Sequence, residues 1–93
     1  MGRYVVEMFG IPYSISGKRQ VEFELEDEVK LSDIIAALRR EIPDLEGEVI
    51  TTGGNYLMEG FTFNINGRFY DNDRTLILND SDHIILLTLA TVG

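Results

Sequence analysis

Residues 61–89 read FTFNINGRFYDNDRTLILNDSDHIILLTL and contain two strand patterns separated by a turn-rich segment. In the first pattern, Phe61, Phe63 and Ile65 alternate with polar residues and so share one face of a strand. Asn66-Gly67 follows directly, and this dipeptide is typical of a type I′ hairpin turn because both central residues need positive φ. The sequence therefore predicts a hairpin over residues 61–70.

The second pattern, HIILLTL at residues 83–89, is apolar at consecutive positions. A short apolar run of this kind is typical of a strand that lies in the middle of a sheet and is covered on both faces. Between the two patterns, residues 71–82 are rich in Asp and Asn, with a short apolar insert at 76–78. We expect turns there, with one short strand.

The first half of the chain predicts two more strands and one helix. Residues 3–9 and 21–26 show period-two alternation, and in VEFELE every second residue is a glutamate, which indicates one wet face. Between these strands, the glycines, prolines and serines of residues 10–17 predict a loop. Apolar residues recur at helical spacing from Leu31 to Ile42, and Pro43 ends that pattern.

The order of these elements predicts an α+β fold. Residues 44–60 hold four glycines and little periodicity, so we expect a long, mobile connection with at most a turn of helix. The first and last long strands are the most apolar and are expected to pair in parallel at the centre of one mixed sheet. That arrangement is a β-grasp domain: four to five strands packed on one main helix, in a single domain of residues 1–93 with a flexible C-terminal tail at 90–93.

The composition of the chain disfavours several classes of function. Sixteen acidic residues against eight basic ones give a net charge of −8, which disfavours nucleic acid as a partner and favours a basic protein. There is no cysteine, so disulfides and thiolate chemistry are excluded. No apolar run approaches the ~20 residues of a membrane span, and the N-terminus is a poor signal peptide. We expect a soluble, cytoplasmic protein that does not associate with membranes.

Side-chain catalysis has no strong candidate. His83 is the single histidine and is best interpreted as a surface residue at the start of a strand. The Asp-rich segments resemble fragments of calcium loops but lack the required glycine and glutamate, so turn formation explains them and no metal site is expected.

The tail remains: Ala90, Thr91, Val92 and Gly93. The tail is uncharged and slender, and it reaches about 13 Å when extended. It could therefore enter a narrow channel in another protein and present a terminal carboxylate there. From the tail alone, a frayed terminus is an equally good interpretation.

Several stretches resemble the ubiquitin-like sulfur carriers of the MoaD and ThiS type, specifically the small subunit of molybdopterin synthase. YVVEMFG is similar to the first strand of that family, GKRQVEFEL to the second, and KLSDIIAAL to the start of its helix. The strongest likeness is FNINGRFYDNDRTLILNDSDHIILLTLATVG, with its Asn-Gly turn, Thr-Leu step, Asp-rich turn and small-residue tail. The family ends in Gly-Gly, whereas Val92 precedes Gly93 here.

The resemblance implies a carrier that is not an enzyme by itself and whose expected place is the small subunit of molybdopterin synthase. An adenylating partner of the ubiquitin-activating type would use ATP to activate the carboxylate of Gly93, a sulfur donor would convert it to a thiocarboxylate, and the synthase large subunit would receive it. Ala90, Thr91 and Val92 would fill the partner channel, and no cofactor would be bound. We expect Phe61, Phe63, Ile65 and Phe69 to form a docking face. Two alternatives stay open: a protein modifier conjugated through the same tail, and an interaction module with an inert tail.

Overall fold

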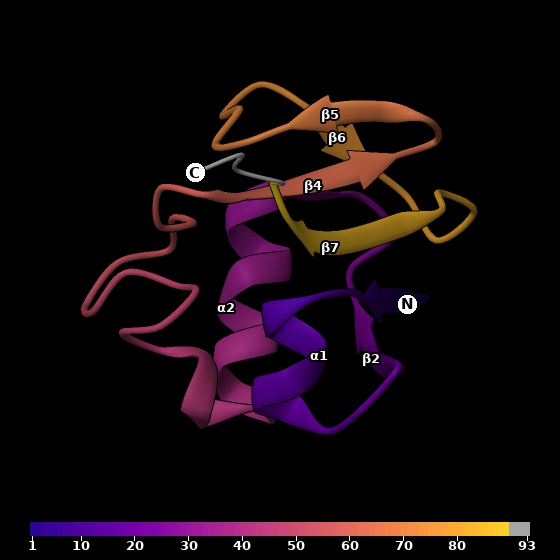
Figure 1. Ribbon diagram of the computed structural model, residues 1–93. Coiled ribbons are helices and arrows are strands. Elements are labelled where there is room, and N and C mark those ends of the chain that lie inside the picture. The colour runs from indigo at the N-terminus through magenta and orange to yellow at the C-terminus, as the bar shows by residue number, and fades with distance from the viewer. Residues whose placement is uncertain (90–93) are drawn as a thin grey trace.

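The computed structural model describes residues 1–89, so the predictions made for the tail at 90–93 lie outside the described residues. A five-stranded mixed sheet, in the order β2-β1-β7-β4-β5, lies against the main helix α2 (Figure 1). A second sheet contains only β3 and β6. The elements are β1 (Gly2–Met8), α1 (Ile11–Ser16), β2 (Gln20–Leu25), β3 (Val29–Lys30), α2 (Leu31–Glu41), the 3₁₀ helix η1 (Pro43–Leu45), β4 (Phe61–Ile65), β5 (Arg68–Tyr70), β6 (Ile77–Leu78) and β7 (Ile84–Thr88).

The centre of the sheet is the parallel pair of β1 and β7, in which Val6 lies opposite Ile84. Antiparallel pairs flank it on both sides, β2 along β1 and β4 along β7. The prediction that the first and last long strands pair in parallel at the centre of a mixed sheet is confirmed.

The core lies between α2 and one face of the sheet. The buried face of α2 contributes Ile34 and Leu38, which are fully buried, and the helix begins at Leu31, directly after Lys30. The N–H of Lys30 donates to Oδ2 of Asp33 at 2.9 Å, which satisfies one donor at the start of the helix. The helix predicted from the apolar spacing is confirmed, and it ends at Glu41, two residues before Pro43.

The predicted hairpin is also confirmed. Among residues 1–89, Asn66 is the one non-glycine residue with positive φ, at 53°, and Gly67 follows at 91°. These values are those that a type I′ turn requires of its two central residues. The turn therefore sets the register of β4 and β5, in which Ile65 lies opposite Arg68.

The loop predicted at residues 10–17 is wrong, because Ile11–Ser16 form the short helix α1. Pro12 stands in the first turn, where its missing N–H costs no helical hydrogen bond. Gly17 ends the helix in the left-handed conformation, with φ 70°, and its N–H donates to the carbonyl of Tyr13. The residues taken as loop formers are thus the start and stop signals of a helix.

The mobile connection predicted at residues 44–60 is wrong as well. Leu45, Val49 and Ile50 are fully buried and belong to the core, and Leu57 is 4% exposed. Ile50 makes isolated bridges with both Glu46 and Leu57. The segment has no long periodic run because its fold is irregular, yet its apolar side chains anchor it.

The last strand occupies the central position that its apolar run predicted. Ile84 and Leu86 are fully buried toward the core, whereas Ile85 and Leu87 on the other face are only half-buried. The expectation of burial on both faces is therefore correct for one face and wrong in degree for the other. No helix within residues 1–89 has the length and apolar character needed to cross a bilayer.

Candidate functional site at the end of the last strand

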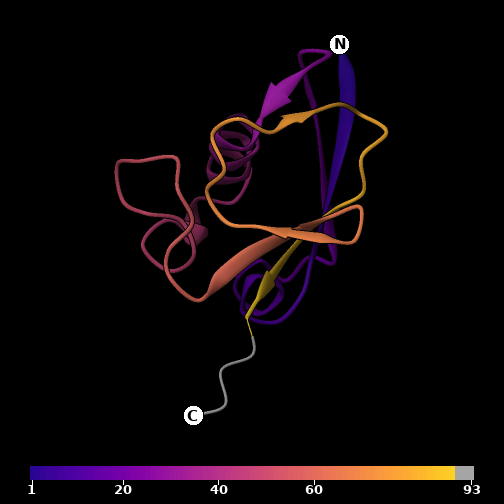
Figure 2. The same ribbon diagram turned by 90° about the horizontal axis from the view of Figure 1, so that it is seen from above.

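The end of β7 is held on both sides, and this fixes where the tail begins. Thr88 lies opposite Phe61 in the β4–β7 ladder. One residue later, the N–H of Leu89 donates to the carbonyl of Gly60 at 2.8 Å. On the other side, the N–H of Ile11 donates to Oγ1 of Thr88 at 2.9 Å, so α1 contacts the end of β7 (Figure 2).

Gly10 makes this close contact feasible. Its φ is 71°, and a Cβ at this position would lie 2.8 Å from Oγ1 of Thr88. A side chain would therefore be strained by the backbone conformation and would also collide with the threonine. Sequence reasoning missed the link between Gly10 and Thr88; its only signal was a glycine after the first strand.

Three large apolar residues near the end of β7 are exposed. Phe9, Ile11 and Leu89 are 56%, 46% and 41% exposed, and we call them the tail-exit surface. They come from two segments, the link from β1 to α1 and the end of β7, which are joined by the hydrogen bonds of Phe9 to Leu86 and Ile11 to Thr88. Exposed apolar groups beside a chain terminus can contact a partner that receives the terminus.

The predicted docking face is wrong for three of its four members. Phe61, Phe63 and Ile65 are at most 9% exposed because their shared face is the one that packs on the core. Phe69 is 61% exposed, on the strand that pairs with β4. Of the four, Phe69 alone is placed to contact a partner.

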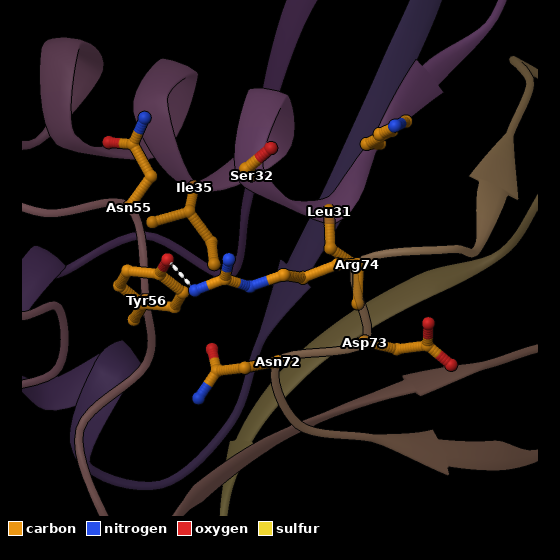
Figure 3. A pocket seen from close by; sticks show the side chains of 9 residues that line it. Leu31, Ser32, Ile35, Asn55, Tyr56, Asn72, Asp73 and Arg74 are labelled. Carbon is orange, nitrogen blue, oxygen red and sulfur yellow. Dashed lines mark hydrogen bonds between the residues drawn. The ribbon is translucent and has the colours of Figure 1, made fainter.

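A cavity of about 340 Å³ lies between the start of α2 and two loops (Figure 3). Arg74 reaches across it, with its guanidinium 4.8 Å from the centre of the Tyr56 ring and hydrogen-bonded to the Tyr56 hydroxyl. Asn72 accepts from the N–H of Leu57 at 2.8 Å. These contacts join the two loops to each other, so we assign them a structural role.

The Asp-rich turn beside this cavity is also structural. Oδ1 of Asp73 accepts from the N–H and the hydroxyl of Thr75 at 2.7 and 2.8 Å. The hydrogen bonds from Thr75 lower the pKa of Asp73 below its ordinary value. Within residues 1–89, no cluster of three or more His, Asp or Glu is arranged to hold a metal ion.

His83 lies on the surface and does not form the hydrogen-bonded serine–histidine–aspartate arrangement of a hydrolase. Its Nε2 is 2.7 Å from Oε2 of Glu7, and its side chain is 63% exposed. Its neighbour Asp82 instead accepts hydrogen bonds from the side chain of Asn66 and the backbone of Asn79. The arrangement is a surface pair, not a buried triad.

No family model and no curated protein sequence matches the chain. Solved structures do. Small archaeal modifier protein 1 from Methanosarcina acetivorans is similar over 100% of this chain and 98% of its own, with 24% identity and a TM-score of 0.75. Small archaeal modifier protein 1 from Haloferax volcanii covers 97% of this chain and 100% of its own, at 19% identity and a TM-score of 0.77.

A candidate molybdopterin converting factor, subunit 1, from Pyrococcus furiosus gives a TM-score of 0.74 at 21% identity. It covers 97% of this chain and 100% of its own. Because these likenesses extend over nearly the whole of each chain, they establish the architecture that the sequence predicted. The chain has the ubiquitin-like β-grasp fold.

Proposed function

We propose that this chain is a ubiquitin-like sulfur carrier that works through the carboxylate of Gly93. The observation that carries the proposal is the anchored end of β7, the central strand. Thr88 and Leu89 are hydrogen-bonded to Ile11 and Gly60, so four further residues would start from a fixed point at the molecular surface. Such a point gives a partner a fixed origin for the tail, from which the terminal carboxylate lies within the reach of four extended residues.

The chemistry follows from the weakness of a carboxylate as an electrophile. The carboxylate of Gly93 attacks the α-phosphorus of ATP on an activating enzyme, which forms an acyl-adenylate and releases pyrophosphate. A hydrosulfide then attacks the acyl carbon, a C–S bond forms, and the C–O bond to AMP breaks. The product is a thiocarboxylate, and neither step needs a metal or cofactor bound by this chain.

The sulfur acceptor that we propose is the pterin precursor of the molybdenum or tungsten cofactor, reached in the large subunit of molybdopterin synthase. The similarity to the candidate molybdopterin converting factor from Pyrococcus furiosus supports this branch. In that complex Ala90, Thr91 and Val92 would occupy the channel, and the tail-exit surface of Phe9, Ile11 and Leu89 would contact its mouth.

The test is intact-mass spectrometry of the purified chain after incubation with ATP, sulfide and the host activating enzyme. We expect a mass gain equal to one sulfur minus one oxygen, located at the C-terminal residue by fragmentation. Deletion of Gly93 removes that product, while Val92→Gly preserves it. A chain that keeps its mass under all these conditions contradicts the carrier function.

A second candidate is a protein modifier that forms isopeptide bonds through the same activated tail. The similarity to small archaeal modifier proteins from two organisms favours it. A modifier leaves conjugates of higher mass in cells, each with the Gly93 carbonyl on a lysine, and these disappear when Gly93 is deleted. A carrier leaves no such conjugates. An interaction module with an inert tail keeps its binding after the same deletion.

A further inference from the structure

The outer side of strand β2 is open. In the sheet order β2-β1-β7-β4-β5, β2 is an end strand, and no other strand of residues 1–89 pairs with its outer side. It is six residues long, from Gln20 to Leu25, against three residues for β5 at the opposite end. An open edge of this length offers backbone groups to another extended segment.

The register shows which residues carry those free backbone groups. The N–H of Met8 donates to the carbonyl of Arg19 at 2.8 Å, so this pair faces inward across the β1–β2 ladder. Inward and outward pairs alternate in an antiparallel ladder. Counting in twos along the register, Val21 and Phe23 also face β1, while Gln20, Glu22 and Glu24 direct their N–H and C=O groups outward.

The side chains that accompany these groups are acidic and accessible. Glu22 and Glu24 are exposed, whereas Val21 and Phe23, on the other face of the strand, are each 7% exposed. Three further acidic residues follow directly at positions 26–28. The nearest opposing charge is Arg3, whose guanidinium is 3.6 Å from Glu22. A surface hollow of about 430 Å³ is lined by Arg3 of β1 together with Glu22, Phe23 and Glu24 of β2.

The negative charge of Glu22 and Glu24 determines which kind of extended segment can pair with the outer side of β2. A second copy of this chain would place glutamates opposite glutamates, and like charges in directly opposed positions destabilise a strand pair. Acidic side chains on an edge are a common protection against self-pairing. They act as a filter, because a segment with lysine or arginine at every second position places each cation opposite a glutamate.

We propose that the β2 edge, formed by Gln20, Glu22 and Glu24, binds an extended basic segment of another protein as an additional strand of the sheet. Outward backbone groups supply the hydrogen bonds, and the glutamates select alternate lysine or arginine side chains. This binding does not involve the tail, so it stands or falls independently of the carrier function.

The probe is a blocked heptapeptide that alternates lysine with valine, added to the isotope-labelled chain and followed by NMR. We expect shifts and slowed solvent exchange at the amides of Glu22 and Glu24. The same peptide with N-methyl groups on alternate residues should lose binding by at least about tenfold, because it cannot complete the ladder. A heptapeptide that alternates glutamate with valine should not bind.

Two variants separate backbone pairing from charge. Glu24→Pro removes an outward N–H without touching the β1 ladder, and edge strands accept proline at such positions. It should bind the peptide at least about tenfold more weakly than Glu24→Gln, which loses only the charge. Glu22→Lys/Glu24→Lys should abolish binding, while the charge-matched control Glu41→Lys/Glu48→Lys, at exposed positions elsewhere, should retain it.

Three results would contradict strand addition at the β2 edge. Equal binding by Glu24→Pro and Glu24→Gln, or by the plain and N-methylated peptides, would mean that attraction is only electrostatic, and would overturn the proposal. Shifts centred on residues outside β2, or none at all, would also overturn it. Pairing of β2 between two copies, seen as concentration-dependent dimers, would contradict the charge filter.

Discussion

The N–H of Ile11 donates to Oγ1 of Thr88 across 77 positions of sequence, at a distance of 2.9 Å. This bond joins the first turn of α1 to the last residue of β7, which are far apart in the chain and adjacent in space. Because β7 leads into the tail, the bond links the stability of α1 to the geometry of the proposed functional terminus.

Thr88→Val keeps the shape of the side chain and removes the acceptor of that bond. We expect a loss of about 1 kcal/mol in the free energy of unfolding, the usual net contribution of one such hydrogen bond. Urea denaturation followed by circular dichroism measures it. Thr52→Val, at an exposed position, is the matched control and should leave the midpoint almost unchanged. Equal effects of the two variants would contradict a stabilising role for the Ile11–Thr88 hydrogen bond.

Gly10→Ala should destabilise the protein more than Gly53→Ala. Both glycines have positive φ, 71° and 76°, so both variants incur backbone strain, and the strain at Gly10 exceeds the left-handed cost of about 1 to 2 kcal/mol because its ψ of −134° lies outside the left-handed region. An added Cβ at Gly53 has no heavy atom within 4 Å, whereas one at Gly10 meets Oγ1 of Thr88 at 2.8 Å. The difference between the two variants in urea denaturation measures the collision together with the extra backbone strain at Gly10.

A double mutant tests the origin of that difference. Thr88→Ala removes the atom that collides with the new methyl group, so Gly10→Ala should cost less in a Thr88→Ala background than in the wild-type chain. Additive losses would show that the two residues do not interact and would contradict the contact.

Tyr4→Phe should lower the free energy of unfolding by about 1 kcal/mol or more. The Tyr4 hydroxyl donates to the carbonyls of Glu26 and Asp27 at 2.9 and 3.0 Å, and the residue is 1% exposed. Calorimetry at neutral pH measures the loss. Tyr13→Phe, at a residue that is 41% exposed, serves as the control and should change the stability little.

Tyr4 should also make the protein sensitive to alkali. Burial, reinforced by the charges of Asp80 and Asp27, raises the pKa of Tyr4 above its ordinary value of 10.0. As pH rises past 10, the unfolded chain ionises at this tyrosine before the folded chain does, so stability falls until the folded pKa is reached. The Tyr4→Phe variant should show a smaller decline over that range, and equal slopes would contradict the assignment.

Hydrogen exchange of the free protein should alternate along β2. The amides of Val21 and Phe23 face β1 and should exchange at least about tenfold more slowly than those of Glu22 and Glu24, which face solvent. Residue-resolved NMR exchange at neutral pH gives the rates directly. A uniform rate along the strand would mean that the outward groups are paired.

The elements that sequence predicted well are those in which one local rule acts without competition. Asn66-Gly67 specifies its turn through backbone sterics alone, and the alternation in VEFELE assigns Val21 and Phe23 to the core. The helix of Leu31–Glu41 follows from its apolar stripe.

The failures lie where tertiary packing decides. Six residues are too few for a periodic signal, and the proline at the start of α1 and the glycine at its end are also typical of a loop. Leu45, Val49 and Ile50 are buried by long-range contacts that no short window reveals.

The candidate site was predictable only in part. Alternation correctly grouped Phe61, Phe63 and Ile65, but a grouping of apolar residues indicates the core face before it indicates a docking face. The meeting of Gly10 with Thr88 depends on a parallel pairing between strands at opposite ends of the chain, and no motif encodes it.

That parallel pairing of β1 with β7 also sets the order of events during synthesis. β1 emerges from the ribosome first, but its central neighbour is the last of the described strands to be made, so the sheet cannot close until nearly the whole chain is out. Contacts between residues so far apart in the sequence slow folding, because the entropy of closing the loop is lost before the contacts stabilise the chain. If the chain is the proposed carrier, its activating enzyme would therefore meet the residues that follow β7 only on chains whose sheet can close.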